Sequence, residues 1–235
     1  MSLSDRRQQI AANLAAVQER IRLSCDGAGR SADEVTLVVV TKFFPASDVR
    51  LLADLGVTDL GENRHQEAEA KAAECVDLEL TWHFVGGLQS NKAAAVAAYA
   101  DAVHSVDRPK LVGPLDRGAA ARPGPLDVLL QVSLDPPGVE HRNGVDPDRL
   151  DELAAAVDAA EHLRLRGLMA VAPLDEDPGE AFTRLAEIRR GFLAARPSAD
   201  WLSAGMSADL EEAVRAGATH VRIGSAVLGS RPQVK

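Results

Sequence analysis

The sequence is poor in cysteine, in aromatic residues and in long apolar runs. Cys25 and Cys75 are the only cysteines among 235 residues, too few for a disulfide framework. The longest apolar strand-like run, Val35–Val40, is far too short to cross a bilayer. The first nine residues contain no apolar stretch of signal-peptide type. These absences predict a globular, cytoplasmic protein without a membrane partner.

Basic side chains are outnumbered by acidic ones. The chain has 26 Lys and Arg against 35 Asp and Glu, a formal net charge of −9. Binding to nucleic-acid phosphates needs clustered positive charge, which such a chain supplies only locally. We therefore expect no nucleic-acid partner. The length and the 46% hydrophobic content are sufficient for a sizeable buried core.

What the chain does have is a regular alternation of strand-like and helical segments. Residues 34–41 are almost continuously apolar or β-branched, which is typical of a strand buried on both faces of a parallel sheet. Further strands are expected at 58–61, 81–85, 102–106, 126–133, 165–171, 200–203 and 219–224. Helices are expected at 47–55, 63–75, 89–99, 108–118, 147–160, 178–195 and 208–216. Eight strands alternating with helices in about 200 residues favour a closed (β/α)₈ barrel over an open sheet.

One further helix is expected ahead of the first strand. Ile10, Leu14, Val17 and Ile21 recur at helical spacing, which predicts a helix over 4–24 that begins at Ser4. No strand precedes this helix, so it should flank the barrel. No linker rich in Pro, Gly or Ser divides the chain. The prediction is therefore a single α/β domain over 1–235, a (β/α)₈ TIM-type barrel with an extra N-terminal helix.

The sequence contains neither a convincing dinucleotide-binding motif nor a convincing set of metal ligands. Residues 27–32 fit the loose dinucleotide pattern G-x-G-x-x-A, but they follow a helix and precede a strand, the reverse of the order that such a site requires. They are better interpreted as a turn. The six histidines are scattered without the spacing of metal ligands, and neither cysteine has a near partner. No metal site is predicted.

Lys42 is the most informative residue at a strand end. Functional groups of (β/α)₈ barrels lie at the carboxyl ends of the strands. Only five of the 26 basic residues are lysines, and Lys42 alone closes a strand that is expected to be buried on both faces. A desolvated lysine has a lowered pKa and a nucleophilic neutral amine, which Schiff-base formation requires. A surface lysine or an ion-pair partner is the alternative, and the position alone leaves both open.

The ends of the seventh and eighth strands favour a phosphate ligand. Met206 and Ser207 precede a helix start, and Gly224 and Ser225 close the last strand. Backbone N–H groups and hydroxyls at such places bind phosphate, and barrel enzymes often use this part of the mouth for it. Taken singly, each serine could equally be an ordinary helix cap. Together with a lysine across the mouth, they favour a ligand with both an aldehyde and a phosphate, as in pyridoxal 5′-phosphate (PLP).

Arg222 fits the same ligand. It lies two residues before Gly224 and so points to the same side of the strand, where an inward arginine needs an acceptor. A pyridine nitrogen would serve, and a permanently charged arginine would keep it unprotonated and weaken the electron sink that carbanion chemistry needs. The alternative is an ion pair with a carboxylate such as Glu62.

Several segments, in this order, resemble the pyridoxal phosphate homeostasis protein family, which is related to the N-terminal barrel of alanine racemase. The segments are Thr41-Lys42, Gly61-Glu62-Asn63, Trp82–Gly86, Leu88–Lys92, Arg166–Met169, Gly205–Ser207 and Arg222–Gly224. The resemblance runs from about residue 5 to 231 and implies PLP held as an aldimine on Lys42. It also implies that Asn63, His83 and Met206 line the cofactor, that Arg222 lies near the pyridine nitrogen, and that Ser203, Ser207, Gly224 and Ser225 surround the phosphate. The chain departs from many members at Phe43-Phe44, Ala204 and Ser225, and the serine keeps the hydroxyl of the usual threonine.

The function that the resemblance implies is PLP homeostasis. The protein would bind, buffer and deliver PLP to apo PLP-dependent enzymes, without substantial turnover and without catalytic residues. The low aromatic content and the many charges on the helices favour a monomer. A PLP-dependent enzyme such as a weak amino-acid racemase is the alternative. Alanine racemases use a tyrosine as second base, and Tyr99, the single tyrosine here, is expected on a helix. A phosphosugar enzyme without PLP is the third possibility.

Overall fold

The eight strands pair in sequence order and close on themselves. The computed structural model describes residues 2–136 and 143–230. Its strands are β1 (Thr36–Val40), β2 (Asp59–Glu62), β3 (Thr81–Phe84), β4 (Ala102–Val106), β5 (Leu126–Gln131), β6 (Leu163–Met169), β7 (Trp201–Ser203) and β8 (His220–Ile223). Each strand is parallel to the next, and β8 pairs with β1 to complete the closed barrel. The predicted (β/α)₈ architecture is thereby confirmed.

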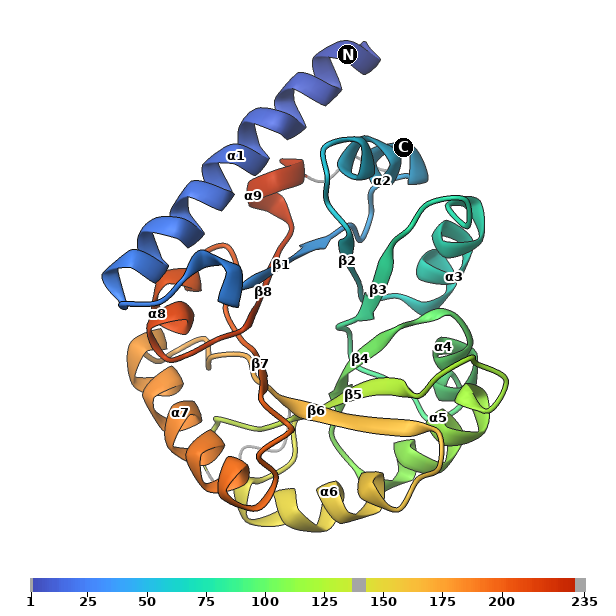
Figure 1. The fold of residues 1–235 in the computed structure, drawn as a ribbon, viewed down its shortest axis with the longest axis vertical. Coiled ribbons are helices and arrows are strands. Elements are labelled where there is room, and N and C mark those ends of the chain that lie inside the picture. Colours follow the sequence, from blue (N-terminus) through green and yellow to red (C-terminus); the bar gives the residue numbers. More distant parts are fainter. Residues whose placement is uncertain (1, 137–142, 231–235) are drawn as a thin grey trace.

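Helices surround the barrel on the outside (Figure 1). They are α1 (Leu3–Gly27), α2 (Ala46–Asp54), α3 (His65–Glu74), α4 (Ala93–Tyr99), α5 (Val112–Ala119), α6 (Leu150–Asp158), α7 (Pro178–Ala195), α8 (Leu210–Arg215) and α9 (Ser225–Leu228). Short 3₁₀ turns at Ala32–Glu34, Pro109–Leu111 and Pro147–Arg149 precede β1, α5 and α6. The apolar faces of the helices pack on the outer faces of the strands and form one continuous core.

The N-terminal helix flanks the barrel, as expected. Helix α1 runs beside α8 and α9 (Figure 1) and buries the apolar stripe that starts at Ile10 and ends at Cys25. It begins at Leu3 rather than Ser4, because Ser2 is the capping residue. The Ser2 hydroxyl accepts from the Asp5 N–H, and the Asp5 carboxylate accepts from the Ser2 N–H, both at 3.1 Å. This reciprocal pair satisfies two backbone donors and fixes the helix start.

Several predicted boundaries are wrong by a few residues. The strand expected at 126–133 ends at Gln131, and the one expected at 165–171 runs over Leu163–Met169. The helix expected at 89–99 begins only at Ala93, because residues 90–92 form a turn. The four-residue helix α9 (Ser225–Leu228) was not predicted at all. The turn expected near Gly27 is present, with Gly29 at φ 67°.

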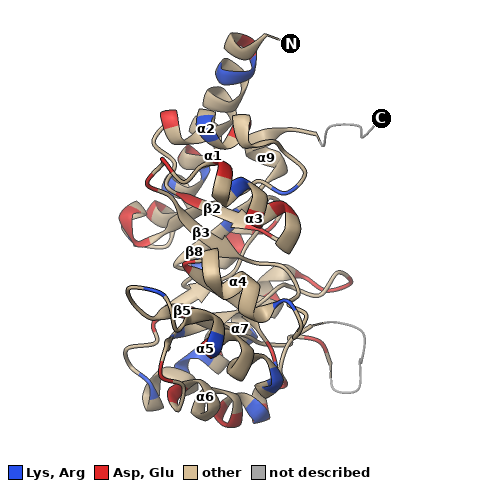
Figure 2. Cartoon of the chain, turned by 90° about the vertical axis from the view of Figure 1, so that its right-hand side faces the viewer, with Lys and Arg blue, Asp and Glu red and all other residues tan. Residues whose placement is uncertain are grey.

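The outer surface is charged and of mixed sign. Figure 2 shows acidic and basic residues interspersed over the helices and loops of one side of the barrel. Across the described residues, no helix has both the length and the apolar character that crossing a membrane requires. Both cysteines are buried and unpaired.

Candidate functional site

A cavity of about 380 Å³ opens among residues at or just beyond the carboxyl ends of β1, β2, β3, β6, β7 and β8. This volume is within the range of small-molecule sites. Most of the residues predicted from the sequence line it: Lys42, Asn63, Met206, Ser207, Arg222, Gly224 and Ser225. Val40, Phe43, Phe44, Val85 and Gly86 add an apolar wall. Segments that are far apart in the sequence thus meet at one cavity because a barrel gathers all its strand ends at one mouth.

Lys42 sits in a tight turn immediately after β1. The Thr41 N–H still donates to the Gly61 carbonyl at 2.9 Å, which extends the pairing with β2, and the Phe44 N–H donates back to the Thr41 carbonyl at 3.0 Å. Between them, Phe43 adopts φ 71°, the left-handed region that non-glycine residues seldom enter. Lys42 is half-buried and lines the cavity. The alternative of a lysine on the outer surface is thereby set aside.

The lysine that is most deeply buried in the described chain is Lys71 on α3, a helix residue that was not among the predicted site residues. Its ammonium donates to the Thr41 carbonyl at 2.7 Å, to Glu62 at 2.6 Å and to Glu67 at 2.7 Å. Glu62 also accepts from the Thr41 hydroxyl at 2.6 Å. Glu67 in turn accepts from the Phe43 N–H at 2.5 Å. One buried ion cluster therefore holds the backbone on both sides of Lys42.

The serines of the mouth are not helix caps. Helix α8 has Asp209 at its N-cap position, and that carboxylate accepts from the Met206 N–H at 2.6 Å. Neither helix α8 nor α9 receives a side-chain cap from Ser207 or Ser225. Among the described residues, the N–H groups of Ser207, Ala208 and Gly224 have no recorded hydrogen-bond acceptor. These unpaired donors and the two hydroxyls suit an anion such as a phosphate.

Two glycines shape this mouth because a side chain would not fit. A Cβ on Gly86 would lie 2.4 Å from the Asn63 carbonyl oxygen, so Gly86 lets β3 approach Asn63 closely. Gly205 has φ 90°, and a Cβ there would lie 2.6 Å from the Cβ of Ala213. The side-chain oxygen of Asn63 is buried and has no hydrogen-bond partner among the described residues. An unsatisfied amide on the cavity wall fits a polar ligand group.

Arg222 is buried and reaches the cavity from β8. Its Nη1 donates to the Ser203 hydroxyl at 2.7 Å and its Nη2 to the Ala170 carbonyl at 3.0 Å. Glu62, the carboxylate considered as its partner, is occupied by Lys71 instead. Burial lowers the pKa of Arg222 to about 10, because the site offers few charges to offset the lost hydration. The guanidinium remains cationic at neutral pH.

Two of the predicted cofactor contacts lie off the cavity wall. Ser203 is fully buried between Arg222 and His104, whose Nδ1 lies 2.8 Å from the serine hydroxyl. His83 lies inside the barrel, with its Nδ1 2.9 Å from His104 and its Nε2 2.9 Å from Asp59. The His83 ring lies between His104 on β4 and Asp59 on β2, whereas Val85 and Gly86, which follow β3, form the cavity wall. Ser203 contacts the cavity-lining Arg222, and His83 is connected to Ser203 through His104.

Tyr99 does not reach the cavity either. Its ring stacks on His65 with centroids 5.9 Å apart, between α4 and the start of α3. Burial, with a smaller contribution from the negative charges of Glu62 and Glu69, raises the pKa of its phenol. A neutral, stacked phenol away from the mouth is poorly suited to act as a base there.

Comparison with known proteins gives these features a family. The sequence model described as "Alanine racemase, N-terminal domain" matches residues 7–232. A pyridoxal phosphate homeostasis protein of Mycobacterium tuberculosis (strain H37Rv) is 44% identical over 97% of this chain and 95% of its own. The chain belongs to the pyridoxal phosphate homeostasis protein family. The homeostasis protein of Escherichia coli (strain K12) is 39% identical, over 96% of this chain and 98% of its own.

Solved structures agree with membership of the homeostasis protein family. PipY of Synechococcus elongatus PCC7942, solved with PLP bound, has 35% identity and a TM-score of 0.81 over 94% of this chain and all of that one. Alanine racemase of Corynebacterium glutamicum shares the fold, with a TM-score of 0.65 at 17% identity, over 97% of this chain and 64% of that one. The homeostasis proteins therefore share the racemase barrel.

Proposed function

We propose that this chain binds PLP as an aldimine on Lys42 and acts in PLP homeostasis by buffering and delivering the cofactor. The observation that carries the proposal is the cavity in which Lys42, Arg222 and the unpaired N–H groups at Ser207 and Gly224 face one another. An aldehyde needs a lysine amine, a phosphate needs clustered donors, and a pyridine nitrogen accepts a hydrogen bond from an arginine.

Each group has a definite part in this proposal. Lys42 supplies the amine, while Ser207, Gly224 and Ser225 hold the phosphate. Asn63 and Met206 lie against the ring, and Arg222 donates to the ring nitrogen. A cationic arginine at that nitrogen keeps it unprotonated, which weakens PLP as an electron sink and favours storage over carbanion chemistry. The PLP-bound relative PipY supports this assignment by its similarity.

The chemistry suits a carrier that exchanges its ligand. A reversible imine forms and breaks by transimination, so amines of other proteins can take PLP from the cavity. We propose apo PLP-dependent enzymes as transient acceptors, and a monomer as the working form. The cytoplasm is the proposed setting, because two buried, unpaired cysteines are typical of a reducing compartment.

The test is the visible absorption spectrum of the purified protein with added PLP, before and after borohydride. The wild type should show a yellow band that borohydride removes, and digestion should place the reduced adduct on the peptide that contains Lys42. Lys42→Ala should lack both the band and the adduct. Lys110→Ala removes an exposed lysine on the outside of the barrel and should behave as the wild type. A wild type that stays colourless and unlabelled would overturn the proposal and favour a phosphosugar ligand.

Exchange in heavy water separates the carrier from an enzyme. A weak racemase would incorporate deuterium at Cα of an amino acid, and Lys42→Ala would abolish the incorporation. The carrier should bind PLP and leave the amino acid unlabelled. Catalytic incorporation by the loaded wild type would replace the carrier proposal by the enzyme.

A further inference from the structure

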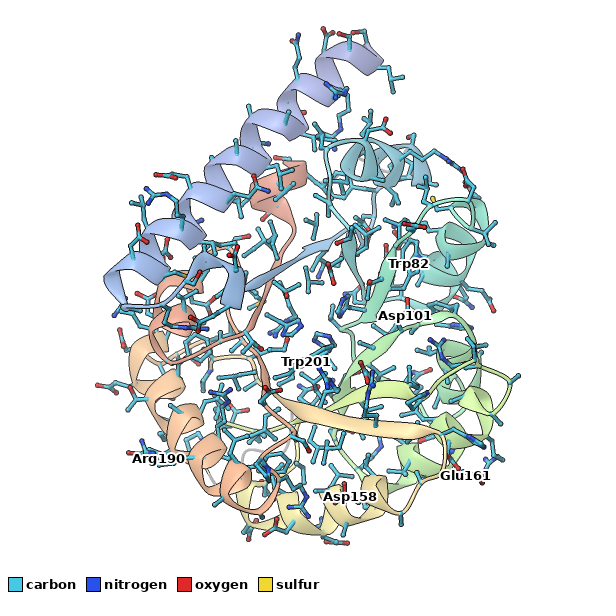
Figure 3. All side chains as sticks on the ribbon, in the orientation of Figure 1. Trp82, Asp101, Asp158, Glu161, Arg190 and Trp201 are labelled. Carbon is cyan, nitrogen blue, oxygen red and sulfur yellow. The ribbon has the colours of Figure 1, made fainter. Side chains whose placement is uncertain are left out.

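Three histidines from distant parts of the chain meet inside the barrel below the cavity. His83 on β3, His104 on β4 and His220 on β8 are all buried. Their ring centroids are 5.0 Å apart for His83 and His104, and 6.1 Å from His220 to each of the others. Trp201, labelled within the ring of strands in Figure 3, packs against His220 with the two ring centroids 4.3 Å apart. Among the described residues, no group of side chains is arranged to hold a metal ion.

Two of the histidines join the cavity to the opposite end of the barrel. Starting at the mouth, Arg222 Nη1 lies 2.7 Å from the Ser203 hydroxyl, which lies 2.8 Å from His104 Nδ1. His104 Nε2 lies 2.9 Å from His83 Nδ1, and His83 Nε2 lies 2.9 Å from Asp59 Oδ1. Asp59 is the first residue of β2 and partly exposed. We call these five residues the interior network.

The two ends of the interior network fix the direction of every hydrogen bond in it. An arginine has only donors and an ionised carboxylate only acceptors. Because the Asp59 carboxylate can only accept, His83 carries a proton on Nε2 and donates it to Asp59. A neutral His83 then accepts at Nδ1, so His104 carries its proton on Nε2 and donates to His83. His104 Nδ1 is left as an acceptor for the hydroxyl hydrogen of Ser203, whose oxygen accepts from Arg222. Both rings are neutral in this arrangement.

The surroundings of His104 favour its neutral form. Full burial lowers the pKa of His104 well below its ordinary value, and the neighbouring His83, His220 and Arg222 add to this effect. Burial acts to raise the pKa of Asp59, but the hydrogen bonds from His83 and Thr58 together lower it and keep the carboxylate ionised. His220 stands outside the interior network, because its Nδ1 bonds the Thr219 hydroxyl at 2.8 Å.

We propose that Asp59, His83, His104 and Ser203 are positioning residues that hold Arg222 in the orientation in which its free donors face the cavity. A hydroxyl that must donate to His104 presents only lone pairs to the guanidinium, so Arg222 always has an acceptor at Nη1. Without that acceptor, the buried guanidinium would turn away from the cavity to find another. The test has two arms. The first measures histidine tautomers and does not depend on the proposed PLP site, whereas the second measures PLP binding and rests on that proposed function.

The first arm measures tautomers in the protein without PLP. In ¹⁵N-histidine NMR spectra near neutral pH, His83 and His104 should both be neutral with the proton on Nε2. Signals are assigned with His83→Gln and His104→Gln, and His220 serves as the internal reference outside the interior network. Either histidine protonated on Nδ1, or charged at neutral pH, would overturn the direction that we assign. This result is independent of whether the protein binds PLP.

The second arm measures PLP affinity and the absorption band. Ser203→Ala removes the acceptor of Arg222 and should weaken PLP binding on the order of tenfold and shift the band, because a hydrogen bond to a charged group is lost. Ser203→Thr keeps the hydroxyl and should restore both. Asp59→Asn should alter the band and the His83 tautomer, whereas Asp127→Asn, which removes a carboxylate outside the interior network, should not. Equal affinity and an unchanged band in Ser203→Ala would contradict the positioning role. A wild type without PLP binding would refute the proposed function instead.

Discussion

At the scale of single residues, the site depends on a lysine that does not line the cavity. Lys42 was found from its place at a strand end, but the turn that presents it is held by Lys71, Glu62 and Glu67. Burial is the main influence on Glu62 and raises its pKa, while the charge and hydrogen bonds of Lys71 oppose that shift. A buried ion cluster of this kind adds little net stability, but removing one member leaves the others uncompensated.

Lys71→Met tests this dependence. The substitution leaves two carboxylates without their cation, so we expect the free energy of unfolding to fall by about 3 kcal/mol. We also expect aldimine formation with PLP to become slower, because the backbone beside Lys42 loses the hydrogen bond from Lys71 to the Thr41 carbonyl. Urea unfolding and stopped-flow absorbance measure the two effects. Lys110→Met changes an exposed lysine and should stay within about 0.5 kcal/mol of the wild type. Equal unfolding midpoints in the two variants would show that the cluster does not hold the turn.

At the scale of elements, the close contact between β6 and β7 depends on Gly167. Its φ is 152°, and a Cβ there would lie 1.9 Å from the Trp201 carbonyl oxygen. Gly167 pairs with Trp201 in the β6–β7 register, and the same two strands bring Met169 opposite Ser203. A side chain at Gly167 would therefore disturb the strand that carries Ser203 into the interior network.

Gly167→Ala should separate the two strands. We expect a loss of about 3 kcal/mol from backbone strain and lost pairing, and a melting temperature lower by roughly 6–12 °C for a chain of this size. Gly191→Ala is the matched control, since it lies in helix α7 with nothing within 4 Å of its added Cβ. That change should raise stability by up to about 1 kcal/mol, because alanine favours the helix. Similar melting temperatures for both variants would contradict the contact.

Among the strands, β1 could be predicted from the sequence, whereas the bounds of β6 could not. The run Thr36–Val40 is apolar without alternation, and such a pattern identifies a buried parallel strand without knowledge of its partners. The shift of β6 to Leu163–Met169 could not be found this way, because Arg164 and Arg166 interrupt its apolar pattern and are stabilised by Asp127 and by stacking on Trp201. Those partners come from other strands.

At the scale of the whole molecule, the closed barrel explains which site residues could be predicted from the sequence. Residues at strand ends, such as Lys42 and Gly224, could be assigned to the mouth because a barrel brings all its carboxyl ends together. The position of His83 off the cavity wall could not be predicted, because its depth in the barrel depends on the stagger between strands. The ion pair between Lys71 and Glu62 could not be predicted either, because it joins a helix to a strand end. The periodicity of a helix shows which face is buried, but not which strand residues that face contacts.

The barrel interior also determines how the whole molecule responds to acid. His220 is buried, and desolvation lowers its pKa to about 3, while the pKa of His104 is lowered as well. In the unfolded chain both titrate near 6.5. Below that pH the unfolded state binds protons that the folded state does not. The stabilising contribution of these histidines is therefore fully present above about pH 6.5, and it is lost as the pH decreases towards 3. Glu62 acts in the opposite sense, because its pKa is raised in the folded protein.

His220→Gln isolates the contribution of one histidine. The variant removes a titrating group that keeps its proton off in the folded state, so its stability should depend less on pH than that of the wild type between pH 6.5 and 4, by up to about 1.4 kcal/mol per pH unit. Urea unfolding across this range measures both slopes. His162→Gln changes a histidine outside the barrel interior and should keep the slope of the wild type. Because Glu62 is present in all three proteins, its opposing effect cancels in the comparison, and parallel slopes for His220→Gln and the wild type would mean that His220 is already protonated inside the folded barrel.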